Sequence, residues 1–140
     1  MLNKYSKYVG IPFKDYGRDP VKNGGVDCYG LVSYILKNEF SINVNLYEDL
    51  SYIEDNPQKT ADNIIKISQN KTEWVDISLD EVKEGDVILM KLQGLPVHLG
   101  LALNNIEMIH VFQGANTVIE NFRNHKWRHR IWGVKRAVVS

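Results

Sequence analysis

Apolar residues follow a helical spacing in the first half of the chain. Starting from Cys28, they recur three, four, seven and eight positions later, at Leu31, Val32, Ile35 and Leu36. This spacing places them on one face of a helix, together with the thiol. We therefore predict a helix over residues 28–38, with Cys28 at its N-terminal tip. The same reasoning predicts a helix over residues 57–69 and a short one over residues 1–9.

Two segments between these helices lack a clear period. Residues 14–26 contain Gly17, Pro20, Gly24 and Gly25, which are typical of turns, so we predict a structured loop. Residues 41–56 are predicted to be irregular.

The second half of the chain changes to short apolar runs separated by turn residues, a pattern typical of strands. Strands are predicted over residues 74–77, 87–90, 97–103, 108–113, 117–121, 131–134 and 137–138. Helices first and antiparallel strands second indicate an α+β fold. The length of 140 residues is typical of one domain, so we expect a single domain over residues 1–140.

Composition narrows the kinds of partner and of location that we expect for this chain. The formal net charge is zero, so nothing global points to a nucleic-acid partner. A single cysteine excludes an internal disulfide framework. No apolar run approaches the length of a membrane span, about 20 residues. The first eight residues contain no apolar signal-peptide core, so we expect synthesis in the cytoplasm.

Cys28 is the candidate nucleophile. A helix N-terminus presents free N–H groups and a positive dipole end, and both favour thiolate over thiol. The same N–H groups are natural donors to an oxyanion. The competing interpretation is that a lone cysteine at the head of an apolar face is an inert, buried, small hydrophobic residue.

His98 is the candidate base. With a period of two, the strand over residues 97–103 presents valine and leucines on one face and His98, Gly100 and Ala102 on the other. The face beside the histidine is nearly bare, which leaves room for another backbone to approach. We expect the tip of the Cys28 helix to use that room.

The position of His110 depends on the hairpin loop. A two-residue loop would pair His98 with Val111 and put the two histidines on opposite faces. A three-residue loop over residues 104–106 would pair Gly100 with His110 and make the histidines diagonal neighbours. A functional pair therefore requires the odd-length loop, with Asn105 a candidate for positive φ. His98 would then exchange a proton with Cys28, and His110 would orient the His98 ring.

Four motifs at this point resemble the NlpC/P60 family of cell-wall cysteine peptidases. They are Asp27-Cys28-Tyr29-Gly30-Leu31-Val32, Glu84-Gly85-Asp86-Val87, His98-Leu99-Gly100-Leu101 and Met108-Ile109-His110. The resemblance implies a papain-like fold, a triad of Cys28, His98 and His110, and hydrolysis of amide bonds in peptidoglycan stem peptides. It implies no cofactor.

Further segments resemble the phage tail-assembly branch of that family. They are Gly10-Ile11-Pro12-Phe13, Gly17-Arg18-Asp19-Pro20, Trp74 and Trp132-Gly133-Val134-Lys135-Arg136. This likeness implies phage tail proteins as partners and action at a virion tail or another extracellular cell-wall site.

The chain departs from the family pattern at three positions. Tyr29 stands where the family usually has serine, Phe13 where it often has a tyrosine that assists the oxyanion, and Ile106 where it usually has glycine. The candidate substrate-lining residues are Phe13, Asp27, Tyr29 and Gly100. Phe13 and Tyr29 also motivate two alternatives: a tail-assembly protein that kept the fold without the activity, and an amidase or acyltransferase acting on another substrate.

Two other features have competing interpretations. Cys28, His98 and His110, or His125 with His129, could ligate zinc, but the chain has no established zinc motif, and we expect no metal. The basic residues at 123–130 are interpreted as a solvated loop, with contact to an anionic wall polymer or a partner protein as the alternative.

Overall fold

The computed structural model describes residues 2–47 and 56–138. The helices in chain order are η1 (Leu2–Tyr8), α1 (Pro20–Asn23), α2 (Cys28–Phe40), α3 (Pro57–Ser68) and η2 (Leu79–Glu81). The strands are β1 (Trp74–Ile77), β2 (Val87–Leu92), β3 (Leu95–Ala102), β4 (Glu107–His110), β5 (Val118–Asn121) and β6 (Ile131–Ala137). The predicted helices at Cys28 and Pro57 are confirmed. The irregular segment is confirmed for residues 41–47, and its remainder to residue 55 lies outside the described residues.

The structure differs from the sequence prediction mainly in the presence, length or type of a few short elements. Residues 14–26 contain α1, a single turn capped by the Asp19 side chain, within the predicted loop. The strand predicted over residues 108–113 is β4, which ends at His110. The helix predicted over residues 1–9 is a 3-10 helix.

Polar side chains determine where the two long helices begin. The Asp27 carboxylate accepts a hydrogen bond from the Gly30 N–H at 2.8 Å, so Cys28 is the first residue of α2. Asn56 caps α3 through the Lys59 N–H in the same way, and Pro57 occupies the first turn, where it costs no hydrogen bond.

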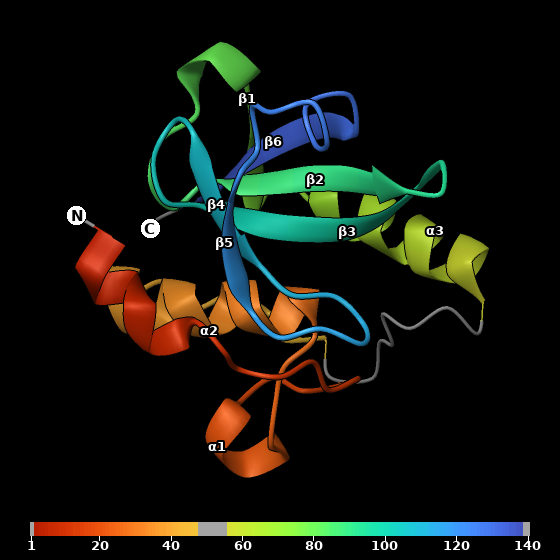
Figure 1. The fold of residues 1–140 in the computed structure, drawn as a ribbon. Coiled ribbons are helices and arrows are strands. Elements are labelled where there is room, and N and C mark those ends of the chain that lie inside the picture. Colours follow the sequence, from red (N-terminus) through yellow and green to blue (C-terminus); the bar gives the residue numbers. More distant parts are fainter. Residues whose placement is uncertain (1, 48–55, 139–140) are drawn as a thin grey trace.

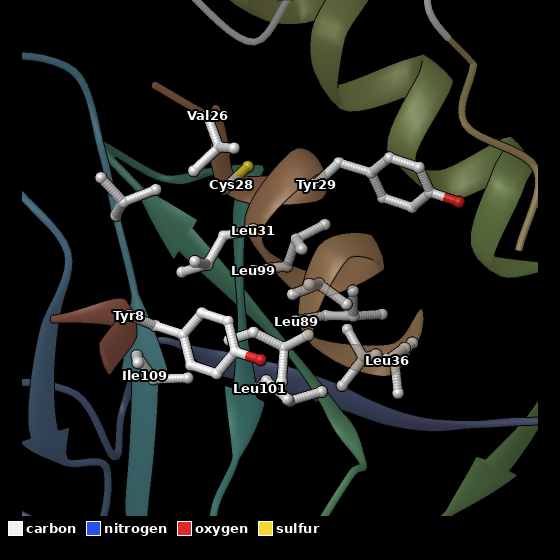
Figure 2. Close-up of a cluster of buried hydrophobic side chains, with 14 of the residues drawn as sticks. Tyr8, Val26, Cys28, Tyr29, Leu31, Leu36, Leu89, Leu99, Leu101 and Ile109 are labelled. Atoms are coloured by element: carbon white, nitrogen blue, oxygen red, sulfur yellow. The ribbon is translucent and has the colours of Figure 1, made fainter. Parts of the chain in front are cut away.

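The described strands form one antiparallel sheet in the order β1-β6-β2-β3-β4-β5 (Figure 1). The helix α2 lies across one face of this sheet, and its apolar side packs against Leu99 and Leu101 of β3. Figure 2 shows this cluster, with Cys28 at one end of it. The opposite face carries a second cluster, in which residues after β5, including Phe122 and Trp127, cover the sheet. This combination of helices and antiparallel sheet is the predicted α+β fold.

The expected use of the bare face of β3 is wrong. The helix α2 packs on the leucine face, because its own apolar side needs apolar partners. A Cβ on Gly100 would lie 3.1 Å from the His110 Cβ and 3.2 Å from the Ile109 carbonyl oxygen, so the neighbouring strand fills the room that Gly100 leaves. Gly100 therefore makes space for His110 rather than for the helix.

No helix within the described residues is both long enough and apolar enough to cross a bilayer.

Candidate active site

The β3–β4 hairpin has the odd-length loop that a histidine pair requires. Leu101 pairs with Ile109, Ala102 pairs with Met108, and the Leu103 N–H donates to the Glu107 carbonyl at 2.8 Å. The loop therefore comprises residues 104–106, as predicted. The positive φ expected at Asn105 is wrong: among the described residues, the non-glycine positions with positive φ are Tyr16, Ser41, Tyr47 and Gln93.

The Asn104 side chain stabilises this loop instead. Its Oδ1 atom accepts hydrogen bonds from the backbone N–H groups of Ile106 at 2.8 Å and Glu107 at 2.7 Å. An asparagine side chain that accepts from the backbone two residues on forms a turn that mimics a backbone turn.

The two histidines are in direct contact. His98 Nε2 lies 2.8 Å from His110 Nδ1, and their ring centroids are 5.1 Å apart. Both rings are almost completely buried. The two strands therefore place the two rings as neighbours on one face, as the odd-length loop implies.

A third polar residue, not identified from the sequence, completes this chain of contacts. His110 Nε2 lies 2.6 Å from Glu120 Oε2, on β5. Met108 pairs with Glu120 and His110 with Val118, which puts Glu120 on the same face as His110. The sequence predicted both strands, but the segment that joins them does not determine their register.

Cys28 and His98 line the same cavity, of about 230 Å³. Phe13, Val111, Phe112 and Gln113 also line it, so Phe13 is a lining residue as expected. Within the described part of the chain, no hydrogen bond joins the Cys28 sulfur to His98. The sulfur interacts instead with the backbone N–H groups of Leu99 and Tyr29.

Burial keeps both candidate reacting groups neutral. It raises the pKa of the Cys28 thiol, the negative charge of Asp27 raises it further, and the backbone N–H groups at the sulfur lower it by less. Burial and the neighbouring His110 hold the pKa of His98 well below its usual value. The pKa is therefore shifted against the thiolate expected from the helix N-terminus, because desolvation by burial is the largest cause of the shift.

Asp27, expected to line the site, has a structural position. It is fully buried, and its carboxylate forms an ion pair with the Arg18 guanidinium at 2.6 Å. Burial raises its pKa to about 6, although Arg18 and the Gly30 N–H both lower it. Arg18 also donates to the carbonyls of Leu46 and Tyr47, at 2.6 and 2.9 Å. Asp27 thus ties the start of α2 to two loops, and it lies outside the cavity.

Tyr29 also lies outside that cavity. Figure 2 shows its ring leaving α2 on a different side from Cys28, toward α3. Its hydroxyl donates to the Asn45 carbonyl at 2.5 Å, and its ring meets Tyr47 edge-on, at a centroid distance of 5.9 Å. Because α2 turns by about 100° per residue, adjacent side chains point in different directions. Tyr29 therefore packs against residues 45–47.

The basic segment at 123–130 contributes a buried side chain behind the histidines. Trp127 is 1% exposed, stacks on His98 at a centroid distance of 5.9 Å and meets His110 edge-on at 5.0 Å. His125 and His129 are exposed, with ring centroids 6.2 Å apart. No group of three or more potential metal ligands occurs within residues 2–47 and 56–138. Through Trp127, the segment 123–130 supports the back of the candidate site.

A cysteine at a helix N-terminus, beside a histidine pair on an antiparallel sheet, defines a papain-like arrangement. The model of the NlpC/P60 family matches residues 10–136, so this chain belongs to that family. No curated protein matches the chain.

Solved structures share the fold. A lipoprotein-like NLP/P60 family protein from Staphylococcus aureus has a TM-score of 0.64 and 19% identity, with 99% of this chain and 40% of that protein covered. The NlpC/P60 domain of the peptidoglycan hydrolase SagA has a TM-score of 0.58 and 19% identity, with 95% and 92% covered. The P60 domain of an antigen from Mycobacterium avium subspecies paratuberculosis has a TM-score of 0.60 and 14% identity, with 99% and 93% covered. The chain thus spans about 40% of the S. aureus protein but nearly the whole of the two isolated domains.

Proposed function

We propose that this domain is a cysteine peptidase that hydrolyses amide bonds in peptidoglycan stem peptides. The observation that carries the proposal is that Cys28 and His98 line one cavity, with His98 held by His110 at 2.8 Å. Membership of the NlpC/P60 family and the structural likeness to a peptidoglycan hydrolase domain support the substrate class.

The proposed mechanism uses Cys28, His98 and His110 as the triad. His98 accepts the thiol proton as the Cys28 sulfur attacks the amide carbonyl carbon. The resulting oxyanion is stabilised by backbone N–H groups at the start of α2. His98 then donates the proton to the leaving amine, and the C–N bond breaks to give a thioester. Water, deprotonated by His98, attacks the thioester carbonyl carbon. The C–S bond then breaks, the carboxylic acid product leaves, and His98 returns the proton to the Cys28 sulfur. The mechanism needs no cofactor.

Because the Cys28 thiol and the His98 imidazole are both neutral at rest, the mechanism requires a source of energy for charging them. Because the thiol and the imidazole are both buried, proton transfer from Cys28 to His98 creates two charges in a poorly solvated site. The transfer becomes favourable when substrate polar groups and the helix N–H groups stabilise the new charges. Substrate binding, rather than a preformed ion pair, therefore activates the nucleophile.

The test is digestion of purified cell walls and of tripeptide and tetrapeptide stem fragments, with Cys28→Ala and Cys28→Ser as matched controls. We expect new amino groups and shortened peptides, detected by mass spectrometry, with the wild-type domain alone. Equal product from the Cys28 variants would remove Cys28 from the mechanism. No product from any form, across wall types, would contradict the proposal.

One observation favours a second candidate, a domain with this fold and no peptidase activity. Cys28 and His98 are only 3% and 1% exposed. The wild-type domain would then cleave no wall fragment, and iodoacetamide would label Cys28 no faster in the presence of stem peptides than in their absence.

We also propose that the domain is part of a phage tail, which carries it to the cell wall. What supports this is the resemblance of residues 10–13, 17–20, 74 and 132–136 to the tail-assembly branch. Immunoblotting of purified virions from the source of the gene, with antibody to the domain, tests it. Detection in the tail fraction is the expected result, and detection only in the bacterial envelope fraction would contradict it.

A further inference from the structure

Glu120 ends a line of three polar side chains that crosses three adjacent strands. His98 on β3 contacts His110 on β4 at 2.8 Å, and His110 contacts Glu120 on β5 at 2.6 Å. The two histidine rings are fully or nearly fully buried, whereas the Glu120 side chain is 24% exposed. The other Glu120 oxygen, Oε1, lies 3.4 Å from the Lys126 ammonium group.

The chemistry of these contacts fixes where the protons are. An ionised carboxylate only accepts hydrogen bonds, so His110 Nε2 must carry a proton and donate it to Glu120. A neutral imidazole has one N–H, so His110 Nδ1 is then an acceptor. The proton between the two rings must therefore belong to His98 Nε2. The remaining nitrogen of His98, Nδ1, is left with a lone pair.

We propose that Glu120 is a positioning residue that selects the tautomers of both histidines and thereby makes His98 Nδ1 the basic nitrogen. This inference rests on the proposed function, in which His98 accepts the Cys28 proton. Without an acceptor at position 120, His110 can place its proton on Nδ1 and donate it to His98. His98 would then carry its own proton on Nδ1, and it could not accept one from the thiol.

The Glu120 charge has a second effect. When His98 accepts a proton it becomes a cation in a buried site, and Glu120 is the anion joined to it through His110. Burial alone would raise the pKa of Glu120, but the interactions with His110 and Trp127, and to a smaller extent the charge of Lys126, hold it below its usual value. The carboxylate is thus ionised at neutral pH and can stabilise the imidazolium.

Two substitutions separate the acceptor from the charge. Glu120→Gln keeps an oxygen that can accept from His110 Nε2 but removes the charge, and Glu120→Leu removes both. Glu107→Gln is the matched control, because Glu107 lies on β4 and its carboxylate accepts from Asn104 instead. Circular dichroism and thermal unfolding first select the variants that fold.

The first readout is ¹⁵N NMR of the histidine ring nitrogens, which reports tautomers without needing activity. A His125→Gln/His129→Gln background leaves two of the four histidines, so that the remaining signals are those of His98 and His110. We expect the Nε2–H tautomer at both rings in this background and in Glu120→Gln, and a substantial Nδ1–H population at His98 in Glu120→Leu. An unchanged His98 tautomer in Glu120→Leu would overturn the inference.

The second readout is peptide hydrolysis. At metal sites, loss of an outer carboxylate that orients a histidine costs roughly 10- to 100-fold in metal affinity or activity, and we adopt the same scale for this histidine pair. We expect kcat to fall about tenfold in Glu120→Gln and about 100-fold in Glu120→Leu, with KM within twofold of wild type. Equal kcat in all four proteins would overturn the inference while leaving the proposed function intact. If the wild-type domain itself were inactive, the proposed function would fail, and the NMR result would still decide the tautomers.

Discussion

Gly30, in the first turn of α2, is the position where an added methyl group should disturb the fold most clearly. A Cβ built there would lie 1.9 Å from the Gly17 carbonyl oxygen and 2.9 Å from its carbonyl carbon. Contacts shorter than 3.0 Å are essentially never found for a real Cβ, so the helix and the loop must separate by about 1 Å. Both contacting atoms belong to the backbone, so rotation of a side chain cannot relieve the clash.

Two opposing effects determine the stability of Gly30→Ala. Alanine is favoured over glycine inside a helix by about 1 kcal/mol. Forcing an extra carbon into a packed site costs about 1–3 kcal/mol, occasionally more. We take the upper end, because the Gly17 carbonyl also accepts from the Asp27 N–H and the Arg18 guanidinium, and these bonds would stretch too. The expected net loss in unfolding free energy is about 2 kcal/mol.

Urea unfolding followed by circular dichroism measures this loss. With a urea dependence of roughly 2 kcal/mol per molar, the midpoint should fall by about 1 M. Gly133→Ala is the matched control: its Cβ would meet only the Leu89 Cδ1 atom, at an ordinary 3.6 Å. That variant should remain within about 0.5 kcal/mol of wild type. A Gly30→Ala domain as stable as wild type would refute the reasoning, because helix propensity would then have outweighed the contact.

Three further predictions concern the candidate site. Trp127→Ala should lower the unfolding free energy by about 3–5 kcal/mol in urea titrations, because a fully buried indole is lost; a loss below 1 kcal/mol would contradict this. Since burial raises the Cys28 pKa, alkylation by iodoacetamide without substrate should rise about tenfold per pH unit from pH 6 to 9; a plateau at pH 6 would indicate a preformed thiolate. Burial lowers the His98 pKa, so below about pH 6.5 the unfolded state binds a proton that the folded state excludes. The free energy of unfolding should therefore fall as the pH drops below about 6.5, by up to about 1.4 kcal/mol per pH unit. His98→Gln should have a flatter pH dependence of unfolding, and an equal slope in both proteins would exclude His98 as its source.

The sequence by itself determined those features that depend on nearby residues. The apolar period after Cys28 is local, and it was sufficient to place Cys28 at the N-terminal tip of a helix, where α2 begins. The short loop between β3 and β4 limited their register to two alternatives. Because side chains alternate between the two faces of a strand, only one of these alternatives puts the two histidines on the same face. In both cases, the residues that decide the geometry are close together in the chain.

Only the tertiary structure decided what depends on residues distant in sequence. Glu120 reaches His110 because of the register in which β5 pairs with β4, and the segment that joins these strands does not determine that register. Tyr29 could be placed only once residues 45–47 were seen to hold its ring and hydroxyl. The sequence put Cys28 at a helix N-terminus, where a thiolate is favoured, but its pKa is raised by burial, which depends on everything packed around it. The local sequence determines the backbone conformation over a few residues. Strand register, packing and desolvation depend on contacts between distant residues, which only the folded chain brings together.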